Sequence, residues 1–169
     1  LAGTVADPDQ LIGKRALVIS FWAPWCENCQ ALEPTMLAVQ KKYAGKVQFV
    51  GIAVSVNQSP ELVRRYVDRH KLSGTQLYDR KGLSIDAYDV PATSFVVVIT
   101  KAGKIVYTGL GGKQDLDAAI QKAAEANEKI DIGVIGCGGR GAWIAELFAK
   151  SGKFNVVAVA DYFQDRVDA

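Results

Sequence analysis

The stretch FWAPWCENC, residues 21–29, carries the clearest indication of fold and chemistry in this sequence. It overlaps the end of a mostly apolar run of strand length, residues 15–22, and it precedes apolar side chains at helical spacing, namely Leu32, Met36, Val39 and Tyr43. We therefore expect a strand that ends just before a helix. Cys26 would then be exposed at the helix N-terminus, where unpaired N–H groups and the helix dipole stabilise a thiolate.

Cys26 and Cys29 lie three positions apart, which is the spacing of a redox pair. Cys29 follows one helical turn after Cys26, so we expect it to be shielded and within reach of a mixed disulfide formed on Cys26. This arrangement predicts that Cys26 is the attacking nucleophile and that Cys29 is the resolving thiol. Trp25 would offer a flat apolar surface beside the nucleophile on which a substrate can dock.

A zinc site is the competing interpretation of two cysteines at this spacing. A structural zinc ion needs four ligands, and the pair supplies only two. The other candidates are Cys137, the single histidine His70 and carboxylates, and none of them forms a second pair at suitable spacing. We therefore predict redox chemistry and no metal. Cys137 is expected to be a bystander chosen for its small size.

The pattern of the first 126 residues predicts a compact α/β unit. Ser59-Pro60 supplies an N-cap and a first-turn proline for a helix that runs to about Lys71. The order of elements is β-α-β-α-β-β-α, which indicates a mixed sheet with helices on both faces. The expected strands are residues 15–22, 47–56, 94–100 and 104–109, and the expected helices follow Cys26, Ser59 and about Leu116.

A new cycle of elements begins at residue 130, after a polar helix tail at residues 124–129 that is expected to serve as a linker. A strand at 130–135, a helix at 142–150 and a strand at 154–160 predict one βαβ unit. Its turn is a G-x-G-x-x-G motif, formed by Gly136, Gly138 and Gly141, and Asp161 ends the second strand. Such glycines permit a close approach of pyrophosphate to the helix N-terminus, and such an acid accepts a hydrogen bond from the ribose of NAD.

Charge and hydropathy narrow the classes of partner. The 169 residues include 20 Lys and Arg against 18 Asp and Glu, with no run of like charge. We therefore expect neither a nucleic-acid groove nor binding to an anionic membrane surface. The longest apolar stretches are of strand length, so no membrane span is expected. Because the first residue is Leu, we expect a processed or trimmed N-terminus.

The stretch FWAPWCENC closely resembles the active-site segment of thioredoxin-fold proteins, and Pro34 matches the proline that kinks the active-site helix in that family. The resemblance covers residues 1–126, and Tyr88-Asp89-Val90 points to the TlpA/ResA-like branch. It implies a thiol–disulfide oxidoreductase that acts on protein substrates without a cofactor. It also implies an extracytoplasmic location, in the bacterial periplasm or cell envelope, and leaves the cytoplasm open.

The same resemblance predicts further site residues. A cis-proline faces the cysteines in that family, and Pro91 is the matching residue, so we expect a cis Val90–Pro91 peptide. Many relatives carry a buried acid where this chain has Ser20, or a glutamate where it has Leu32. The proton acceptor for Cys29 is therefore open between Glu27 and Glu33. Independently of the resemblance, the acid Glu27 next to Cys26 would oppose a thiolate, and we expect the protein to act as a reductant.

Residues 129–169 resemble the N-terminus of the Gfo/Idh/MocA oxidoreductases, whose dinucleotide-binding domain is a complete doubly wound sheet. Only about forty residues of that family are present here, so its catalytic residues cannot be assigned. We divide the chain into a thioredoxin-like domain, residues 1–126, and a partial dinucleotide-binding unit, residues 127–169. NAD binding is expected only in a longer chain. The apolar strands of the unit are expected to pair with a sheet edge of the first domain or of a second copy.

Two other functions remain open at this point. The first domain could be a redox-inactive or regulatory thioredoxin-like module attached to an NAD-dependent Gfo/Idh/MocA-type dehydrogenase. Alternatively, the chain could be a nucleotide-binding fragment to which the first domain is an appendage. Both cysteines and Trp25 are present, which favours the disulfide-exchanging enzyme.

Overall fold

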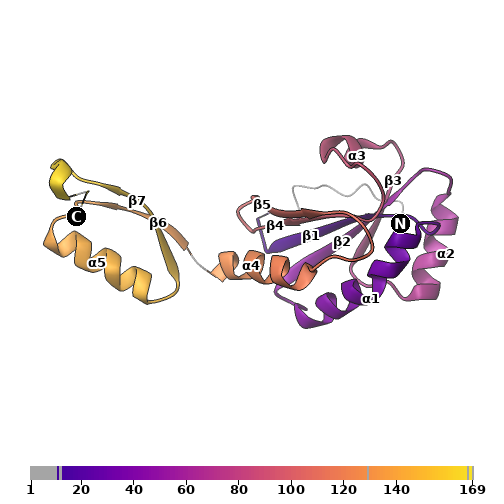
Figure 1. Ribbon diagram of the computed structural model, residues 1–169, viewed down its shortest axis with the longest axis horizontal. Coiled ribbons are helices and arrows are strands. Elements are labelled where there is room, and N and C mark those ends of the chain that lie inside the picture. Colours follow the sequence, from indigo (N-terminus) through magenta and orange to yellow (C-terminus); the bar gives the residue numbers. More distant parts are fainter. Residues whose placement is uncertain (1–10, 12, 129, 167, 169) are drawn as a thin grey trace. The chain divides into compact units, whose positions relative to one another are not determined.

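A computed structural model of the protein describes residues 11, 13–128, 130–166 and 168, and Figure 1 shows its helices and strands. Contacts within the chain divide it into two compact units, of which one ends at Ala124 and the other begins at Glu125.

The first unit contains the strands β1 (Ala16–Trp22), β2 (Val47–Val54), β3 (Thr75–Asp79), β4 (Phe95–Ile99) and β5 (Ile105–Gly109). They form one sheet in the order β3-β2-β1-β4-β5. The first three strands pair in parallel, whereas β4 runs antiparallel to both β1 and β5. The mixed sheet predicted from the sequence is therefore confirmed.

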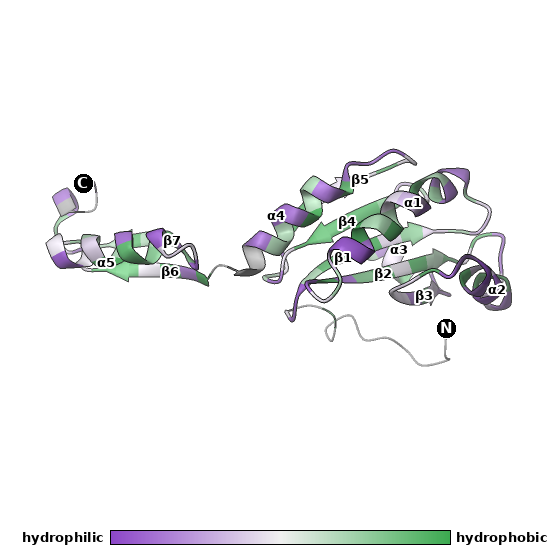
Figure 2. Ribbon diagram, turned by 90° about the horizontal axis from the view of Figure 1, so that it is seen from below, coloured by the Kyte–Doolittle hydropathy of each residue, from purple (hydrophilic) through white to green (hydrophobic). Residues whose placement is uncertain are grey.

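Four helices accompany this sheet, namely α1 (Glu27–Lys42), α2 (Pro60–His70), α3 (Leu83–Ala87) and α4 (Leu116–Glu128). Alternate residues of β1 point to opposite faces, as the pleat of a strand requires. Val18 packs with apolar side chains of α1 and α4, whereas Ile19 and Phe21 pack on the other face with Tyr88 and Val90. Figure 2 shows the apolar strands between these layers. Helices thus flank the sheet, as predicted.

The segment between α2 and β4 holds two elements that the predicted order omits, β3 and α3. β3 is a five-residue strand at the edge of the sheet. α3 begins where the buried Asp79 carboxylate accepts hydrogen bonds from the amides of Ser84, at 2.9 Å, and Ile85, at 3.2 Å. A short edge strand and a helix capped from five residues away have little local signal in the sequence.

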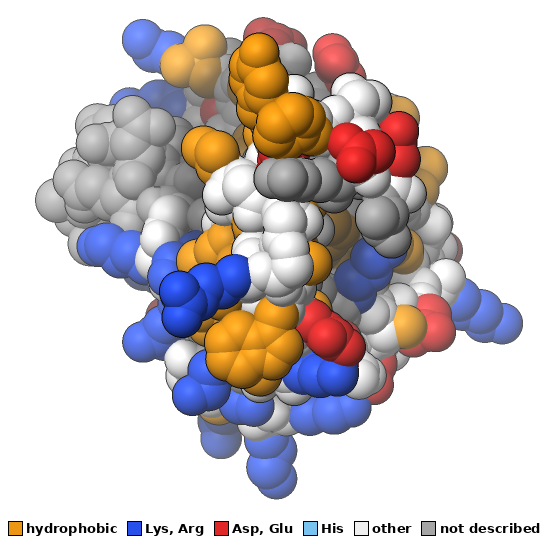
Figure 3. Space-filling view, turned by 90° about the vertical axis from the view of Figure 1, so that its left-hand side faces the viewer, with side chains coloured by type: hydrophobic (Ala, Val, Ile, Leu, Met, Phe, Trp, Pro, Cys, Tyr) orange, Lys and Arg blue, Asp and Glu red, His pale blue; other side chains and the backbone are white. Residues whose placement is uncertain are grey.

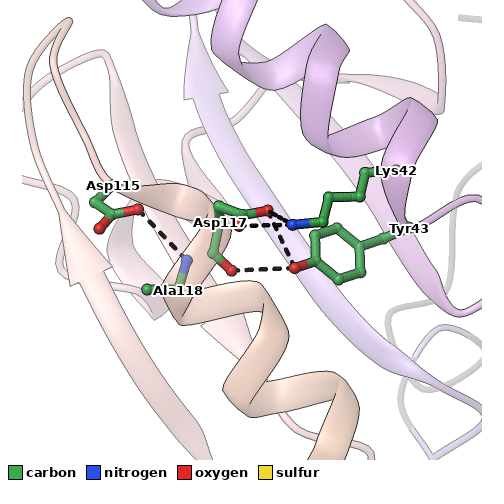
Figure 4. A network of polar contacts seen from close by, with 5 residues as sticks. All are labelled: Lys42, Tyr43, Asp115, Asp117 and Ala118. Carbon is green, nitrogen blue, oxygen red and sulfur yellow. Dashed lines mark hydrogen bonds and ion pairs between the residues drawn. The ribbon is translucent and has the colours of Figure 1, made fainter.

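A polar network joins the end of α1 to the start of α4 (Figure 4). Lys42 Nζ donates to both carboxylate oxygens of Asp117 at 2.7 Å, and the Tyr43 hydroxyl donates to Asp117 Oδ1 at 3.1 Å. The hydrogen bond from Lys42 lowers the pKa of the Asp117 carboxyl, and the same bond raises the pKa of Lys42. The network holds the first turn of α4, whose Leu116 and Ile120 are completely buried.

The second unit consists of β6 (Ile130–Ile135), α5 (Gly139–Lys150), β7 (Phe154–Ala160) and a short 3-10 helix (Gln164–Arg166). β6 and β7 pair in parallel as a two-stranded sheet. The helix begins three residues earlier than the predicted residue 142. No residue from 130 to 165 is buried. Ile135 and Trp143 of this unit are exposed, and Figure 3 shows apolar side chains at the surface among lysines and arginines.

Candidate active site

The two cysteines of the first unit lie at the start of α1 and form a disulfide, with their Cα atoms 5.2 Å apart. Cys26 is the N-cap residue: its sulfur accepts a hydrogen bond from the Cys29 amide at 3.1 Å, and its carbonyl accepts one from Gln30. A residue in this position faces the unpaired N–H groups of the first helical turn. The strand that ends before a helix, with Cys26 at the helix start, is confirmed.

The exposure of the cysteines differs from our expectation. Cys26 is 5% exposed and Cys29 is 8% exposed, so the nucleophile is not the more accessible of the two in the disulfide form. Both pack in a cluster with Trp22 and Val63. Trp25 is the exposed neighbour, at 47%, and its Nε1–H donates to the Val56 carbonyl at 2.9 Å. Its role in substrate docking stays a prediction.

A cavity of about 60 Å³ lies behind the cysteines, between α1 and the sheet. Its walls include Cys29, Ser20, Trp22 and Glu33. Trp22 is 7% exposed, and its buried Nε1–H has no hydrogen-bond partner among the described residues. Most of the walls are apolar, but Ser20, Glu33 and the Trp22 indole N–H bring polar groups to them, and the volume has room for water, since one water needs about 10–15 Å³ by this measure.

Glu33 is the carboxylate in the wall of this cavity, and α2 holds it in place. The Tyr66 hydroxyl donates to Glu33 Oε1, and His70 Nδ1 lies 3.1 Å from Glu33 Oε2. The rings of Tyr66 and His70 stack with centroids 3.9 Å apart. Burial and the hydrogen bond to Glu33 raise the pKa of Tyr66 far above its ordinary value, so its hydroxyl stays protonated and donates. Tyr66 was not predicted as a site residue, and His70 was considered only as a ligand for zinc.

The other candidate acids differ from Glu33 in position. Glu27 is exposed in the first turn of α1 and does not line the cavity. Ser20 lines the cavity but brings a hydroxyl instead of the carboxylate found in many relatives, and Leu32 is buried in the core. Of the two predicted proton acceptors, the structure thus brings only Glu33 to the cavity beside Cys29.

The prediction of a cis peptide before Pro91 is wrong, because the structure has no cis peptide bond in its described residues. The chain enters β4 through Ser94 instead of through Pro91. Ser94 is buried, has a left-handed φ of 68°, and donates its amide to the Phe21 carbonyl at 2.8 Å. Pro91 itself is exposed, and Val90 packs against the core beneath the sheet. The residue that lines the cavity from this segment is therefore Ser94.

The glycine-rich turn of the second unit brings its predicted residues together. Gly136 has a φ of 88°, and a Cβ on Gly141 would lie 1.6 Å from the Gly136 carbonyl oxygen, so both positions require glycine. Gly138 is the N-cap of α5. Asp161 accepts hydrogen bonds from the Cys137 amide at 2.6 Å and the Phe163 amide at 3.0 Å. The carboxylate therefore lies against the turn.

Within residues 11, 13–128, 130–166 and 168, no three His, Cys, Asp or Glu side chains gather in a way that could hold a metal ion. In the same residues, no helix has the length and apolar character needed to cross a membrane.

Comparison with known proteins places the first unit in a family. Residues 2–126 match the family described as Redoxin. The thioredoxin-like protein YneN of Bacillus subtilis is 29% identical over 133 residues, which are 78% of this chain and 72% of YneN. The thiol-disulfide oxidoreductase ResA of Halalkalibacterium halodurans is 35% identical over 114 residues, 66% of this chain and 62% of ResA.

A solved structure with a similar fold is also described as a disulfide oxidoreductase. A secreted disulfide oxidoreductase of Mycobacterium tuberculosis has a TM-score of 0.60 at 27% identity, and the match covers 70% of this chain and 87% of that one. The family match ends at residue 126, so the resemblance of residues 129–169 to Gfo/Idh/MocA proteins stays a prediction. The sequence-based prediction of a thioredoxin-like thiol–disulfide oxidoreductase is confirmed for the first unit: the chain belongs to the redoxin family.

Proposed function

We propose that the protein reduces disulfides of protein substrates, with Cys26 as nucleophile and Cys29 as resolving thiol. The observation that carries this assignment is the N-cap position of Cys26, whose sulfur accepts the Cys29 amide. The same hydrogen bond and the helix dipole would stabilise a Cys26 thiolate in the reduced protein. Cys29 lies one turn further in, on the wall of the cavity.

The exchange proceeds in two steps. The Cys26 thiolate attacks one sulfur of the substrate disulfide, which forms a mixed disulfide and releases the other substrate sulfur as a thiolate. The Cys29 thiolate then attacks the Cys26 sulfur and releases the second substrate thiol. Two electrons pass to the substrate and the enzyme is left with the Cys26–Cys29 disulfide, which an external dithiol must reduce. No cofactor is needed, because the electrons move with the sulfur–sulfur bonds.

The second step requires the proton of Cys29 to leave, and we propose Glu33 as its acceptor. Glu33 and Cys29 line the same cavity, in which water can carry the proton between them. The Tyr66 hydroxyl and the His70 ring hold the carboxylate in this position. Glu27 is exposed outside the cavity and is therefore the weaker candidate.

Two experiments test these roles. Brief iodoacetamide treatment of the reduced protein, followed by peptide mapping, should label Cys26 before Cys29 and Cys137. Faster labelling of Cys29 would reverse the assigned roles. In dithiothreitol-coupled insulin reduction, the wild type should turn over and Cys26→Ser should abolish this turnover. If the protein is a redox-inactive module instead, the wild type itself should show no insulin reduction.

Glu33→Gln should slow release of substrate from the mixed disulfide on the order of 10- to 100-fold near neutral pH. The rate should recover as the pH rises and Cys29 ionises without help. Glu27→Gln is the matched control, because it removes an exposed carboxylate from the same helix. Equal losses in the two variants would exclude Glu33 as the specific acceptor.

We propose an extracytoplasmic location for the protein, in the bacterial periplasm or cell envelope. The disulfide oxidoreductase of M. tuberculosis with the same fold is described as secreted. Export of a reporter fused to the native gene product, measured by protease accessibility in intact cells, tests this location. Recovery of the reporter in the cytosolic fraction alone would contradict it.

The second unit favours a second, weaker candidate activity, which is dinucleotide binding at the glycine turn. The glycine positions and Asp161 have the arrangement that such a site needs. However, the Cys137 amide, which a phosphate would need as a hydrogen-bond donor, already donates to the Asp161 carboxylate. In addition, a dinucleotide normally lies between two βαβ halves. We therefore expect NAD to bind this chain no more tightly than about millimolar. Calorimetry that finds micromolar binding, lost in Asp161→Ala, would contradict this.

We also propose that the second unit self-associates through its strands. β6 and β7 pair only with each other among the described residues, so each has an unpaired edge, and Ile135 is 89% exposed. Sedimentation velocity should show concentration-dependent dimers of the full chain. Replacing Ile135 and Val157 with lysine should leave monomers, and a chain that is monomeric at all concentrations would contradict the proposal.

A further inference from the structure

A groove of about 390 Å³ borders the active site along α2. Its apolar part comprises Pro24, Trp25 and Leu62, and the side chains of Trp25 and Leu62 are 47% and 46% exposed. The hydrogen bond from Trp25 Nε1 to the Val56 carbonyl fixes the indole as one wall. Because Trp25 directly precedes Cys26, a substrate segment in this groove would lie within a few residues of the reacting sulfur.

The polar part of the groove is cationic. Arg65 and Arg69 line it from α2, one helical turn apart, and no Asp or Glu is among its lining residues. No ion pair within 4 Å is found for either arginine in the described part of the chain. α2 is among the most hydrophilic elements of the fold (Figure 2).

Two acidic groups lie near the groove without an ion pair to its arginines. Glu33 accepts the Tyr66 hydroxyl and lies beside His70. The hydrogen bond from Ser59 lowers the pKa of the Glu61 carboxyl, and the charge of Arg65 adds to this effect, but no ion pair within 4 Å joins Glu61 to Arg65. The groove therefore combines an exposed indole with two guanidinium groups. Guanidinium groups bind carboxylates through paired N–H donors.

From this combination we infer that the groove binds an acidic segment next to the substrate disulfide, and that Arg65 and Arg69 select substrates with Asp or Glu close to the reacting cysteine. The inference rests on the proposed disulfide-reducing function and specifies its substrate class. An apolar or aromatic residue of the same segment would pack on Trp25 and Leu62. The paired arginines distinguish an acidic segment from a neutral one of the same shape.

The test uses two disulfide-bonded peptides that are identical except for two Glu residues beside one cysteine, replaced by Gln in the second peptide. At low ionic strength, kcat/KM should be about 3- to 10-fold higher for the Glu peptide, and the ratio should fall towards 1 at 0.5 M salt. The double variant Arg65→Gln/Arg69→Gln should abolish the preference. Arg64→Gln is the matched control, since Arg64 lies on the same helix but does not line the groove.

Charge reversal gives a second readout that does not depend on lost activity. Arg65→Glu/Arg69→Glu should prefer a peptide with two Lys residues at the same positions over the Glu peptide. Equal kcat/KM of the wild type for the Glu and Gln peptides, or a preference that survives the double variant, would overturn the inference. A wild type that reduces neither peptide nor insulin would instead show that the proposed function fails.

Discussion

Both units of the chain contain a strand, a short loop and a helix that follows an extended N-cap residue, but only one of these motifs is enclosed. Cys26 caps α1 with its own sulfur, and β1 before it is buried at every position except Ser20. Gly138 caps α5 without a side-chain hydrogen bond, and β7 beside it is exposed over its last four residues. The local motif is similar, and the surrounding elements differ.

The difference shows what converts such a motif into a reactive site. In the first unit, α2 brings Tyr66 and His70 to Glu33, and the loop before β4 brings Ser94 to the cavity. In the described part of the second unit, the glycine turn donates hydrogen bonds to Asp161 and to the carbonyl of Ala160. A helix N-terminus supplies N–H groups in both cases, but a cavity with a half-buried acid in its wall needs neighbouring layers.

The largest expected effect compares the two cores directly. Phe21 is completely buried between the rings of Tyr88 and Phe95, so Phe21→Ala should lower the free energy of unfolding by about 3–5 kcal/mol. Trp143 in α5 is 58% exposed, so Trp143→Ala should change it by less than about 0.5 kcal/mol. Urea unfolding measures both. A large decrease in the free energy of unfolding for Trp143→Ala would show that the Trp143 ring is covered in solution. The two units would then not differ in the burial of their aromatic side chains as the structure indicates.

A smaller effect concerns the glycine turn. A Cβ on Gly141 would collide with the Gly136 carbonyl, so Gly141→Ala should separate α5 from β6 and destabilise the second unit by about 1–3 kcal/mol. Gly139→Ala is the control, because a Cβ there meets nothing within 4 Å, and alanine should stabilise the helix slightly. Hydrogen exchange of the α5 and β6 amides should accelerate only in the first variant. Unchanged exchange would show that the turn tolerates a side chain.

The smallest effect tests how the start of α4 is held to the first unit. The pKa of the Asp117 carboxyl is lower in the folded protein than in the unfolded chain. The ionised carboxylate therefore stabilises the fold fully at pH values above the pKa of the unfolded chain, and this stabilisation is lost as the pH falls through the pKa of the folded protein. Asp117→Asn should therefore be slightly less stable than wild type at pH 7, and the two proteins should converge below about pH 4. Thermal melts across this pH range check the sign. A difference that persists at pH 2 would exclude the carboxylate charge as its cause.

The sequence predicts the parts of this molecule that local patterns specify. The apolar run that ends at Trp22, the cysteine spacing and the Ser59-Pro60 signal each lie within a few residues, and each predicts the observed element. The glycine turn and Asp161 likewise lie together as their spacing indicates. The redox pair and most of the fold could therefore be predicted without a structure.

The parts that were missed depend on contacts between distant residues. Tyr66 and His70 reach Glu33 across 33 and 37 positions, and their only local signal is that they share a helix face one turn apart. Ser94 adopts a left-handed conformation that serine rarely favours, so the neighbouring Pro91 was the more obvious candidate. The burial of Cys26 depends on its packing with Val54 and Val63, which lie far from it in the sequence.

The short separation of the two cysteines has a consequence for the chain entropy of the enzyme. The Cys26–Cys29 bond closes a ring of only four residues, so in the loop-closure description it restricts the unfolded chain by on the order of 2 kcal/mol, against nearly 5 for a loop of 100 residues. Opening and closing the bond therefore changes the balance between folded and unfolded chains comparatively little. A catalyst built in this way can alternate between its two redox forms in every turnover while the rest of its fold stays intact.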